Sequence, residues 1–414
     1  MPRALVLYHF FHPDDVVSSR HFSDMAAGLA ERGWQVMARP CNRSCRNESH
    51  KYTPSDTARN VRIERIWRPR FQQAQFLGRL LNAIWMLGAW SLATFRMNPP
   101  DLLVVGTDPI LTVFVAIPWK LIRPRTKIVH WCFDLYPEAA IADGRLPGTG
   151  ALPAIVRTFL RTAYGCCDLI VDIGPCMRNL LARYGSAARV LTITPWALSE
   201  PAVELRPDTL ERNALFGDVK LALMYSGNFG RAHSFEEVLA VARAVRKESI
   251  GFAFSVRGNR TDELHSAVSK EDRNIRFVPF ADEQRLEARL SAADIHIVTL
   301  RHEWTGSVVP SKFFGALAAG RPVLFVGSQN SSLARWIKIH RVGWLLDGSN
   351  QAEIVAELLR LAESPEELRA LFAHCHRVYE QHFSRTYLMD RLELELRNLI
   401  NAQITVPAHS KEAA

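Results

Sequence analysis

Cysteine is scarce in this sequence, and its spacing does not suit a disulfide framework or a metal site. Seven cysteines are scattered over 414 residues, an odd number that indicates reduced, buried thiols. Cys41 and Cys45 lie close together, but no second pair or histidine cluster completes a zinc-binding pattern. We therefore expect a reducing, cytoplasmic environment and no bound metal.

Long hydrophobic runs are also absent. The clearest apolar run, 80–95, has sixteen residues and contains Asn82 and Ser91, whereas a helix that spans a bilayer needs about twenty. Met1 to Arg3 are followed at once by a short strand pattern, which is not typical of a cleavable signal peptide. We expect a chain that is not inserted across a membrane.

Acidic residues are outnumbered by basic ones. The chain has 51 basic and 42 acidic residues and a net charge of +9, which favours an anionic partner. Nucleic acid is not expected, because no nucleic-acid-binding module is recognisable and the aromatic residues do not alternate with basic ones as a stacking surface requires. A phosphorylated ligand or a membrane surface fits better.

The apolar segment 71–95 has two interpretations. As a helix on a membrane surface, it would place Trp85 and Trp90 at the interface and nearby basic residues toward the lipid headgroups. As a core helix, it would pack on a sheet. The sequence alone leaves both open. The basic residues of the membrane interpretation are Arg68, Arg70 and Arg79, with a later cluster of Lys120, Arg123, Arg125 and Lys127.

The rest of the chain alternates short apolar strands with amphipathic helices. With 414 residues it is too long for one core, so two domains are expected. Such alternation is typical of α/β folds with parallel sheets. We predict two Rossmann-like domains that face each other across a cleft. Their expected bounds are 1–196, a linker 197–218, 219–385, and a closing helix 386–404.

The segment 294–327 predicts a strand, a loop, a helix and a second strand. Pro310 and Ser311 are typical of a helix start, and Gly320 is typical of a helix end. In a parallel sheet such a loop lies at the carboxyl end of its strand, and the following helix directs free N–H groups toward that crevice. Ser311 and Lys312 are therefore expected to face an anion.

A second candidate anion site is the loop SGNFGRAHS at 226–234, between a predicted strand and a predicted helix. Gly227 and Gly230 allow the backbone to approach a diphosphate, and Arg231 offers charge-assisted hydrogen bonds. Together with Lys312, the loop predicts a phosphate-binding site in the second half of the chain.

The run VPSKFFGALAAGRPV at 309–323 resembles the donor-site segment of retaining glycosyltransferases of the GT-B fold, family 4, especially the WbuB-like branch that assembles bacterial surface polysaccharides. The loop 226–234 resembles the donor-phosphate loop of the same family. The resemblance implies that 1–196 binds the acceptor, that 219–385 binds a nucleotide sugar, and that 386–404 crosses back onto the first domain. The donor-binding residues that it implies are Gly227, Asn228, Gly230, Arg231, Gly258, Phe280, Glu303, Ser307, Pro310, Ser311 and Lys312.

Two positions depart from the family pattern. Many members carry two glutamates where this chain has Ser307 and Gly315, and the second glutamate normally binds the nucleotide ribose. Glu303 is a nearby candidate for that contact. The ribose is therefore expected to be held differently in this chain, or not at all.

In the first domain, the segment 127–138 runs from a strand into a loop at Asp134, and it resembles the family segment that places polar side chains in the cleft. Family members often have a histidine where this chain has Phe133. Asp134 is expected to orient or deprotonate the acceptor hydroxyl, and His130 is the alternative group.

The loop that precedes a helix predicted over 21–32 resembles the family's acceptor-facing loop, without its usual glycines. It implies an acceptor-binding set. Alternatively, the loop holds only a helix-capping serine and an exposed arginine. The set is Ser18, Ser19, Arg20 and His21.

These features predict a glycosyltransferase that moves a sugar, with retention, from a nucleotide diphosphate sugar to a saccharide acceptor that is expected to be lipid-linked. No cofactor is expected, because the nucleotide sugar is a co-substrate, and cations with helix N-termini are expected to replace a metal. The protein is expected to lie peripherally on the inner face of the cell membrane. The alternatives are a sugar-nucleotide epimerase of the same fold and a non-catalytic protein that binds nucleotide sugars or lipid phosphates.

Overall fold

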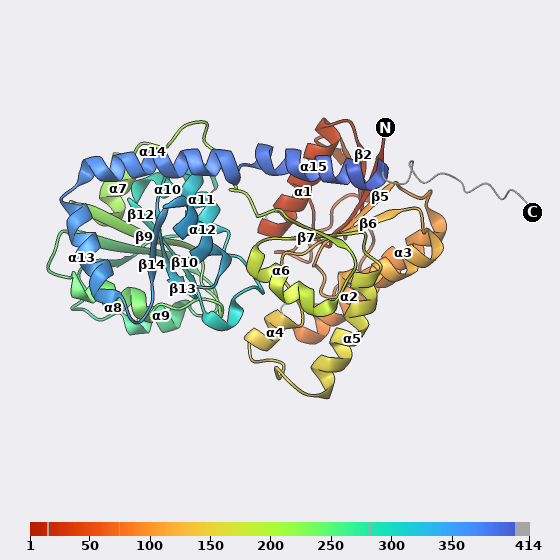
Figure 1. Ribbon diagram of the computed structural model, residues 1–414, viewed down its shortest axis with the longest axis horizontal. Helices are drawn as coiled ribbons and strands as arrows, with labels where there is room; N and C mark the ends of the chain where they lie inside the picture. The colour runs from red at the N-terminus through yellow and green to blue at the C-terminus, as the bar shows by residue number, and fades with distance from the viewer. Residues whose placement is uncertain (15, 74, 282, 402–414) are drawn as a thin grey trace, which may run out of the picture.

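Two largely parallel sheets, each covered by helices on both faces, form two lobes that lie side by side (Figure 1). This computed structural model describes residues 1–14, 16–73, 75–281 and 283–401. The prediction of an α/β fold with two parallel-sheet domains is confirmed.

The first sheet has the strand order β3-β4-β2-β1-β5-β6-β7-β8. Neighbouring strands are parallel except β3 and β4, which pair antiparallel at the edge. Every residue of β5 is buried, because helices cover both faces of the sheet. The strands are β1 (Arg3–Leu7), β2 (Gln35–Ala38), β3 (Ser55–Ala58), β4 (Val61–Glu64), β5 (Leu102–Val105), β6 (Lys127–Trp131), β7 (Leu169–Asp172) and β8 (Arg189–Thr192).

The second sheet has the strand order β11-β10-β9-β12-β13-β14, and its printed pairings are all parallel. Its apolar strands match the pattern of a sheet that is buried on both faces. The strands are β9 (Leu221–Asn228), β10 (Ile250–Arg257), β11 (Ile275–Phe277), β12 (Ile295–Leu300), β13 (Val323–Gly327) and β14 (Gly343–Leu346).

Helices cover the first sheet in two layers, because successive side chains of a strand point to opposite faces. In β1, Ala4 and Val6 pack with α1 and α15, while Leu5 and Leu7 pack with α2, α3, α5 and α6. The helices before the linker are α1 (Val17–Glu31), α2 (Phe76–Arg96), η1 (Thr112–Val115), α3 (Ala116–Ile122), α4 (Glu138–Ala142), α5 (Ala151–Gly165), α6 (Pro175–Leu181) and η2 (Ala182–Tyr184).

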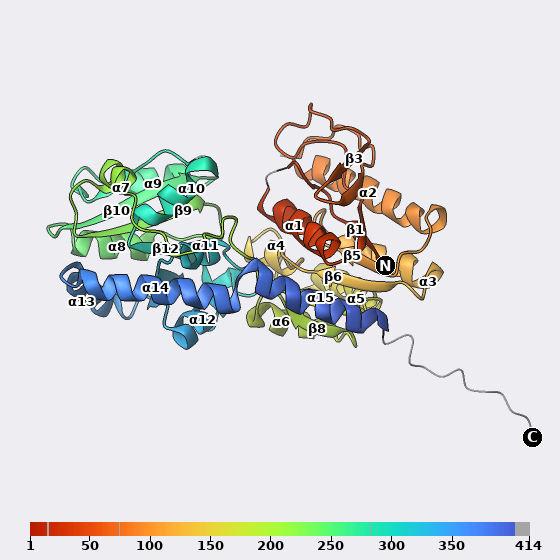
Figure 2. The same ribbon diagram turned by 90° about the horizontal axis from the view of Figure 1, so that it is seen from above.

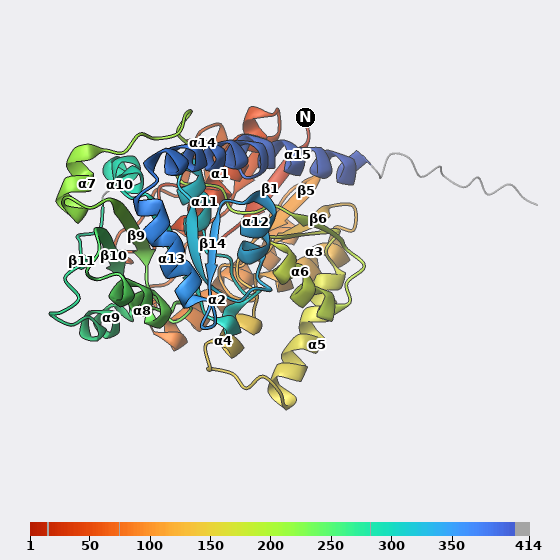
Figure 3. The same ribbon diagram turned by 60° about the vertical axis from the view of Figure 1, so that its left-hand side comes forward.

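The second sheet is also covered on both faces, with α7, α10 and α14 on one side and α8 and α9 on the other (Figures 1 and 3). The helices after residue 208 are α7 (Thr209–Phe216), α8 (Glu236–Ala244), α9 (Thr261–Ala267), η3 (Glu283–Arg285), α10 (Leu286–Ala292), η4 (His302–Trp304), α11 (Lys312–Ala318), α12 (Ser332–His340), α13 (Gln351–Ala362), α14 (Pro365–His382) and α15 (Arg385–Asn401).

The predicted linker 197–218 contains a helix, α7. Asp208 caps this helix by accepting a hydrogen bond from the backbone N–H of Glu211 (2.8 Å). The pattern DTLE at 208–211 is the sequence signal of such a start. Leu215 and Phe216 pack against the second sheet, so α7 is part of the second lobe and the extended part of the linker is 197–208.

The lobes are joined by the linker and by the junction of α14 and α15, which together span both lobes (Figures 1 and 2). The hydroxyl of Tyr379 accepts a hydrogen bond from the N–H of Ala197 (2.8 Å) and donates one to Glu200. Glu200 also accepts one from the N–H of Arg385 (2.7 Å). The two crossings are therefore tied at one point. Of the closing helix expected over 386–404, residues 402–404 lie outside the described residues.

Helix α2 has one buried and one exposed face. Met86 and Trp90 lie in the core below the first sheet, so Trp90 does not reach a membrane interface as one interpretation expected. No helix in the described ranges combines the length and the apolar character needed to cross a bilayer. The exposed apolar residues, at helical spacing, are Leu77, Leu81, Ile84, Trp85, Leu92 and Phe95.

The basic residues expected at a membrane surface separate into two groups. Arg68 is 0% exposed, and the Nζ atoms of Lys120 and Lys127 lie 2.8 and 3.5 Å from the carboxylate of Asp168. Arg68 is therefore an internal charge, and Asp168 neutralises Lys120 and Lys127. The expectation that these three face lipid headgroups is corrected. The exposed members are Arg70, Arg79 and Arg125, with Arg123 half-buried.

Candidate functional site

A cavity of about 490 Å³ lies between the lobes. It opens at the carboxyl ends of strands from both sheets, where loops of parallel α/β folds bind ligands. Both lobes contribute residues, so a ligand in the cavity would contact both. The lining residues are Val16, Val17, Ser18, Arg46, Phe133, Asp134, Ile173, Pro195, Asn228, Arg257, Val308, Val309 and Ser311.

Lys312, the first residue of α11, lies against the end of β9. Its Nζ donates a hydrogen bond to the carbonyl oxygen of Asn228 (3.1 Å) and lies 5.1 Å from the centre of the Tyr225 ring. Gly227 has φ +137°, and a Cβ there would lie 2.4 Å from Cε of Lys312. Only glycine therefore lets the lysine reach this place. Desolvation lowers the pKa of Lys312 to about 8.

The turn before α11 contributes a hydroxyl to the same cavity. Pro310 is buried, and Ser311 lines the cavity. Ser311 occupies the N-cap position without a side-chain capping bond, so capping does not occupy its hydroxyl. The structure thus brings Ser311, Asn228, Gly227 and Lys312 together, as the two predicted anion-binding segments require.

An arginine and an aromatic ring form a further wall. The guanidinium carbon of Arg257, at the end of β10, lies 4.2 Å from the centre of the Phe280 ring. The next residue, Gly258, has φ +141°, and a Cβ there would lie 2.3 Å from the carbonyl oxygen of Phe229. Glycine is therefore needed where the loops after β9 and β10 meet. Sequence reasoning named Gly258 and Phe280 but missed Arg257.

Arg231 lies in a neighbouring polar recess with Arg260 and Arg301. Its Nη1 is 3.4 Å from Oδ1 of Asp143, which follows α4 in the first lobe, and its side chain is 52% exposed. Gly230 precedes it, close to Asn259. The two predicted cations therefore lie on the same lobe, Arg231 in the polar recess and Lys312 beside the cavity between the lobes.

The positions of the two family glutamates have other uses in this chain. Ser307 is buried, and its carbonyl oxygen accepts a hydrogen bond from the N–H of Leu135 in the first lobe (3.0 Å). Gly315 lies on α11, where an added Cβ would be 3.9 Å from Leu290. Glu303 is exposed on η4, 3.9 Å from Nε of Arg301. Glu303 therefore lies beside the polar recess and not in the wall of the cavity that Ser311 lines.

Asp134 follows β6 and enters the cavity from the first lobe. Asp134 is exposed to the cavity, but the surrounding walls exclude part of the water from its carboxyl group, and the charge of Asp108 lies nearby. Both effects raise the pKa of Asp134 to about 6. A carboxyl group with this pKa, accessible from the cavity, can accept a proton near neutral pH.

His130 is placed differently from the catalytic role expected of it. It lies in β6 and is 2% exposed. Its Nδ1 is 3.1 Å from the carbonyl oxygen of Val105, and its ring is 5.6 Å from that of Tyr164 on α5. Burial lowers the pKa of His130 to about 4. The strand directs this side chain toward α5, so His130 is a buried, neutral residue, although it lines a small cavity together with Asp134.

The acceptor-binding residues expected in the first loop lie in a helix instead. α1 begins at Val17, and the N–H of Arg20 already bonds to the carbonyl oxygen of Val16 (3.0 Å). Ser18 lines the cavity, and Arg20 is partly exposed. Helical periodicity therefore leaves Ser18 at the site and turns its neighbour Ser19 away.

Ser19 and His21 are both 0% exposed. The hydroxyl of Ser19 donates to the carbonyl oxygen of Asp14 (3.2 Å). The ring nitrogens of His21 lie 2.7 and 3.1 Å from the carbonyl oxygens of Val17 and Trp196. Both side chains are buried and bonded to backbone carbonyl groups, so they do not face the cavity where an acceptor was expected to contact them.

Two residues that sequence reasoning missed, His9 and Asp108, lie at neighbouring strand ends. Nδ1 of His9 is 3.3 Å from Oδ1 of Asp108, and the N–H of His9 donates to the carbonyl oxygen of Asp108 (2.9 Å). Burial would lower the pKa of His9, but the charge of Asp108, together with the neighbouring Cys41 thiol, outweighs it and raises the pKa to about 9. The signal that points to them is a polar residue shortly after an apolar strand.

Metal binding finds no support in the described ranges, where no group of three or more His, Cys, Asp or Glu side chains could hold an ion. Cys41 is buried, and its thiol donates to the carbonyl oxygen of Arg43 (3.2 Å). The spacing of Cys41 and Cys45 thus reflects packing.

Two family models match the chain in succession. Residues 18–196 match the model described as Glycosyl transferase 4-like domain, and residues 220–364 match the model described as Glycosyl transferases group 1. The chain is 25% identical over 358 residues to the probable glycosyltransferase WbjE of Pseudomonas aeruginosa, an alignment that covers 84% of this chain and 88% of WbjE.

Two further proteins are similar. The putative colanic acid biosynthesis glycosyl transferase WcaI of Escherichia coli (strain K12) is 27% identical over 274 residues, covering 62% of this chain and 65% of WcaI. The crystal structure of Anabaena HepE in complex with UDP-glucose superposes with a TM-score of 0.61 at 12% identity, covering 96% of this chain and 100% of HepE. At this identity the structural likeness shows the shared fold.

Proposed function

The chain belongs to the glycosyltransferases that join a glycosyl transferase 4-like domain to a glycosyl transferases group 1 domain, and we propose that it transfers a sugar from a nucleotide diphosphate sugar to a saccharide acceptor in polysaccharide or lipopolysaccharide assembly. One observation carries this proposal. Asn228 and Ser311, beside Lys312, share a single cavity with Asp134 of the other lobe. The names of WcaI and of the HepE complex with UDP-glucose support the class of product and of donor.

The second lobe is assigned to the donor diphosphate. Gly227 leaves the backbone bare beside Lys312, so a phosphate can approach both the backbone and the ammonium group. Charge-assisted hydrogen bonds from Lys312 would stabilise the negative charge that develops on the leaving diphosphate. Arg231, half-exposed beside Asp143, is the second cation. With charge supplied by these side chains, we propose a metal-independent reaction.

The base of the nucleotide is assigned to the wall formed by Arg257 and Phe280. The guanidinium group already lies over the ring, and such a flat pair offers a stacking surface. The ribose would lie between this wall and α11. Because Gly315 replaces the family's ribose-binding glutamate, we expect the ribose hydroxyls to contribute little to affinity.

Asp134 is assigned to the acceptor. It is the carboxyl group that the first lobe places in the cavity, so it can accept a hydrogen bond from the attacking hydroxyl. We propose that the anomeric configuration is retained, which requires the hydroxyl to attack from the side of the leaving phosphate. In that geometry the phosphate can take the proton and Asp134 orients the hydroxyl.

The exposed face of α2 is assigned to an anionic bilayer surface, and a lipid-linked acceptor would enter from it. Leu77, Ile84 and Phe95 project large apolar groups from one stripe, and Arg70 and Arg79 near the start of the helix are exposed. Apolar groups flanked by exposed arginines suit the boundary between acyl chains and acidic headgroups. On this basis the protein is peripheral, on the cytoplasmic side of the membrane.

A thermal-shift screen of nucleoside diphosphates and their sugars tests the donor assignment. Ligand present at 100 times its Kd should raise the free energy of unfolding by about 2.7 kcal/mol, and a ten-fold weaker affinity in Lys312→Ala should reduce that gain to about 1.4 kcal/mol at the same ligand concentration. Turnover of the best donor is then measured by release of the nucleoside diphosphate. The proposal fails if no nucleotide stabilises the parent protein, or if Lys312→Ala responds as the parent does.

A further inference from the structure

Three neighbouring strands of the first sheet each deliver a polar residue to the same edge. The strands β1, β5 and β6 are adjacent and parallel. His9 follows β1, Asp108 follows β5 and Asp134 follows β6. Because the carboxyl ends of parallel strands meet at one edge of a sheet, these residues form a row that ends at the cavity.

Asp108 is the middle member of the row, and it is fixed from one side only. Its carboxylate lies 3.3 Å from Nδ1 of His9, and its carbonyl oxygen accepts the N–H of His9 (2.9 Å). The His9 side chain is buried, while that of Asp108 is 39% exposed. His9 thus holds Asp108 from within the lobe.

We propose that Asp108, held by His9, is a positioning residue that controls whether Asp134 carries a proton when the acceptor occupies the cavity. The inference rests on the proposed function, because that function assigns Asp134 to the acceptor hydroxyl. The negative charge of Asp108 favours a proton on Asp134. The positive charge of His9 partly cancels this effect. The charges of His9 and Asp108 therefore act on the protonation of Asp134 in opposite directions.

The pKa values of Asp134 and His9 are shifted in the directions that this arrangement requires. Desolvation, followed by the charge of Asp108, raises the pKa of Asp134 to about 6. Although burial opposes it, the charge of Asp108 helps to raise the pKa of His9 to about 9. At pH 7 His9 is therefore a cation, and Asp134 is close enough to its pKa for a change at Asp108 to alter its occupancy by a proton.

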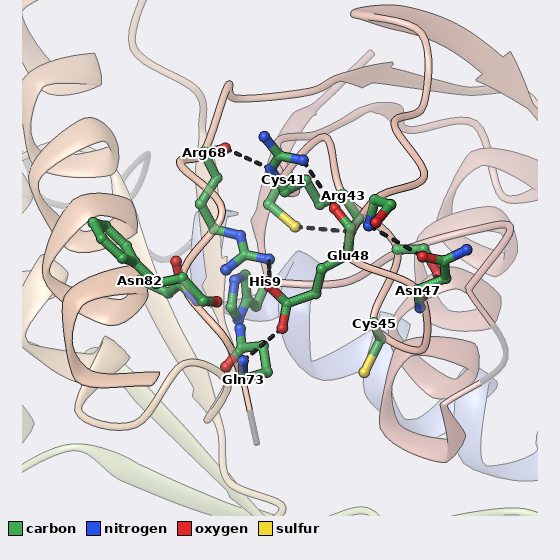
Figure 4. A network of polar contacts seen from close by, with 12 residues as sticks. His9, Cys41, Arg43, Cys45, Asn47, Glu48, Arg68, Gln73 and Asn82 are labelled. Atoms are coloured by element: carbon green, nitrogen blue, oxygen red, sulfur yellow. Dashed lines mark hydrogen bonds and ion pairs between the residues drawn. The ribbon is translucent and has the colours of Figure 1, made fainter. Parts of the chain in front are cut away.

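The far side of His9 is polar as well (Figure 4). Arg68 is 0% exposed, and its Nη2 lies 4.0 Å from Oε2 of Glu48. Figure 4 shows both near His9, with Cys41 close by. Arg68 and Glu48 carry opposite charges, so together they act on His9 and Asp108 less than either charge would alone.

The other titratable groups around Asp134 are neutral side chains and arginines. One of the neutral side chains is His130, which lines a small cavity together with Asp134 and whose pKa burial lowers to about 4. Burial raises the pKa of Tyr8, Cys132 and Tyr136, so all three are neutral at pH 7. Two arginines also line the cavity, Arg46 of the first lobe and Arg257 of the second. Near Tyr136 the charged groups are Arg79 and Arg145. Asp108 is therefore the anion that the first lobe sets against Asp134.

Two charge-removing variants should move Asp134 in opposite directions. Asp108→Asn removes the anion, and it also removes the main support for the proton on buried His9. The two losses act on Asp134 in opposite directions, so the acidic limb of the turnover profile should shift down by less than about half a pH unit. His9→Asn keeps a donor near the position of Nδ1 without the charge, and it should shift the same limb up by a similar amount. The double variant should follow Asp108→Asn, because buried His9 loses its charge once Asp108 is neutral. A merely structural role would not give shifts of opposite sign.

A direct titration keeps the test independent of turnover. Carboxyl ¹³C NMR of the full chain, with the Asp134 signal assigned by its loss in Asp134→Asn, reports the same two shifts without a substrate. Asp101→Asn is the matched control, since Asp101 lies at the opposite end of β5, where it binds the N–H of Arg3 (2.7 Å). It should leave the Asp134 titration unchanged.

The outcomes separate the inference from the proposed function. An Asp134 signal that titrates identically in the parent and in Asp108→Asn overturns the inference, whatever the activity. Shifts of the same sign for His9→Asn and Asp108→Asn also overturn it. If the NMR shifts are as expected but no acceptor receives a sugar, the inference about Asp108 stands and the assigned reaction is refuted. Asp108→Ser replaces the asparagine variant if the latter does not fold.

Discussion

The two lobes build their halves of the cavity in different ways. The second lobe uses backbone geometry, because Gly227 and Gly258 have positive φ and leave room for Lys312 and for the neighbouring loop. The first lobe uses side chains carried on elements far apart in the chain, such as Ser18 on α1 and Asp134 after β6. The donor half is thus encoded locally. The acceptor half depends on which strands become neighbours.

The comparison predicts that changes in the first lobe impair transfer and leave the donor site intact. Asp134→Asn should lower turnover on the order of 100-fold, the scale of a positioned acid or base, with an unchanged Kd for nucleotide. Turnover of the parent should fall as the pH drops through about 6, because protonation removes the charge of Asp134 and weakens the hydrogen bond that it accepts from the acceptor hydroxyl. Steady-state kinetics and calorimetry measure the two effects. A matching loss of nucleotide affinity would break the comparison.

Membrane contact should also be confined to the first lobe. Replacing both Ile84 and Phe95 of α2 by aspartate removes two exposed apolar groups and should weaken binding to anionic vesicles more than about ten-fold. The matched control replaces Leu210 and Ile339, exposed apolar residues of α7 and α12 in the second lobe. Vesicle sedimentation should show no change for the control. Equal losses for both pairs would mean that the surface is not specific to α2.

Changes in the second lobe should act on donor binding. Lys312→Ala should weaken nucleotide binding by about ten-fold, corresponding to a charge-assisted hydrogen bond worth about 1.5 to 3 kcal/mol. Because desolvation lowers the pKa of Lys312 to about 8, affinity should fall as the pH rises through 8. Lys312→Arg should remove this pH dependence, since arginine stays protonated. Lys338→Ala, on the exposed side of α12, is the control, and calorimetry at pH 7 and 9 is the measurement.

Arg231→Ala should have the smallest effect, a loss of nucleotide affinity of about two- to five-fold. The arginine is half-exposed and already paired with Asp143 (3.4 Å), so binding a phosphate exchanges one ionic contact for another. Asp143→Asn removes the competing carboxylate and should slightly tighten nucleotide binding. Finding that Arg231→Ala costs more than Lys312→Ala would mean that the polar recess, not the cavity, holds the diphosphate.

The sequence supports prediction best where the signal is local. Apolar strands between breakers predict both sheets, and the segment around Pro310, Lys312 and Gly320 predicts the turn into α11 and its end. Helix α7 was missed although its signal, the cap of Asp208 on Glu211, is local too. The prolines and the weak hydrophobic pattern of 197–218 predict a linker there, which conflicts with the local signal for a helix.

The acceptor half could not be predicted in the same way. Whether Ser19 faces a ligand or the core depends on where α1 begins, and helix starts without a capping side chain, like this one at Val16, carry little sequence signal. The pairing of His9 with Asp108 depends on the adjacency of β1 and β5, which lie far apart in sequence. Charge neutralisation of Lys120 by Asp168 is likewise a long-range event.

The bonds of Glu200 to Tyr379 and Arg385 have a mechanical consequence. They tie both chain crossings at one point, so a rotation of one lobe against the other would turn about that point. Other contacts between the lobes, such as that of Leu135 with Ser307, lie away from it. A small rotation there would widen the cavity most at its edge farthest from Glu200. That edge would therefore limit the size of an acceptor, and stronger bonds at Glu200 would make the cavity harder to open.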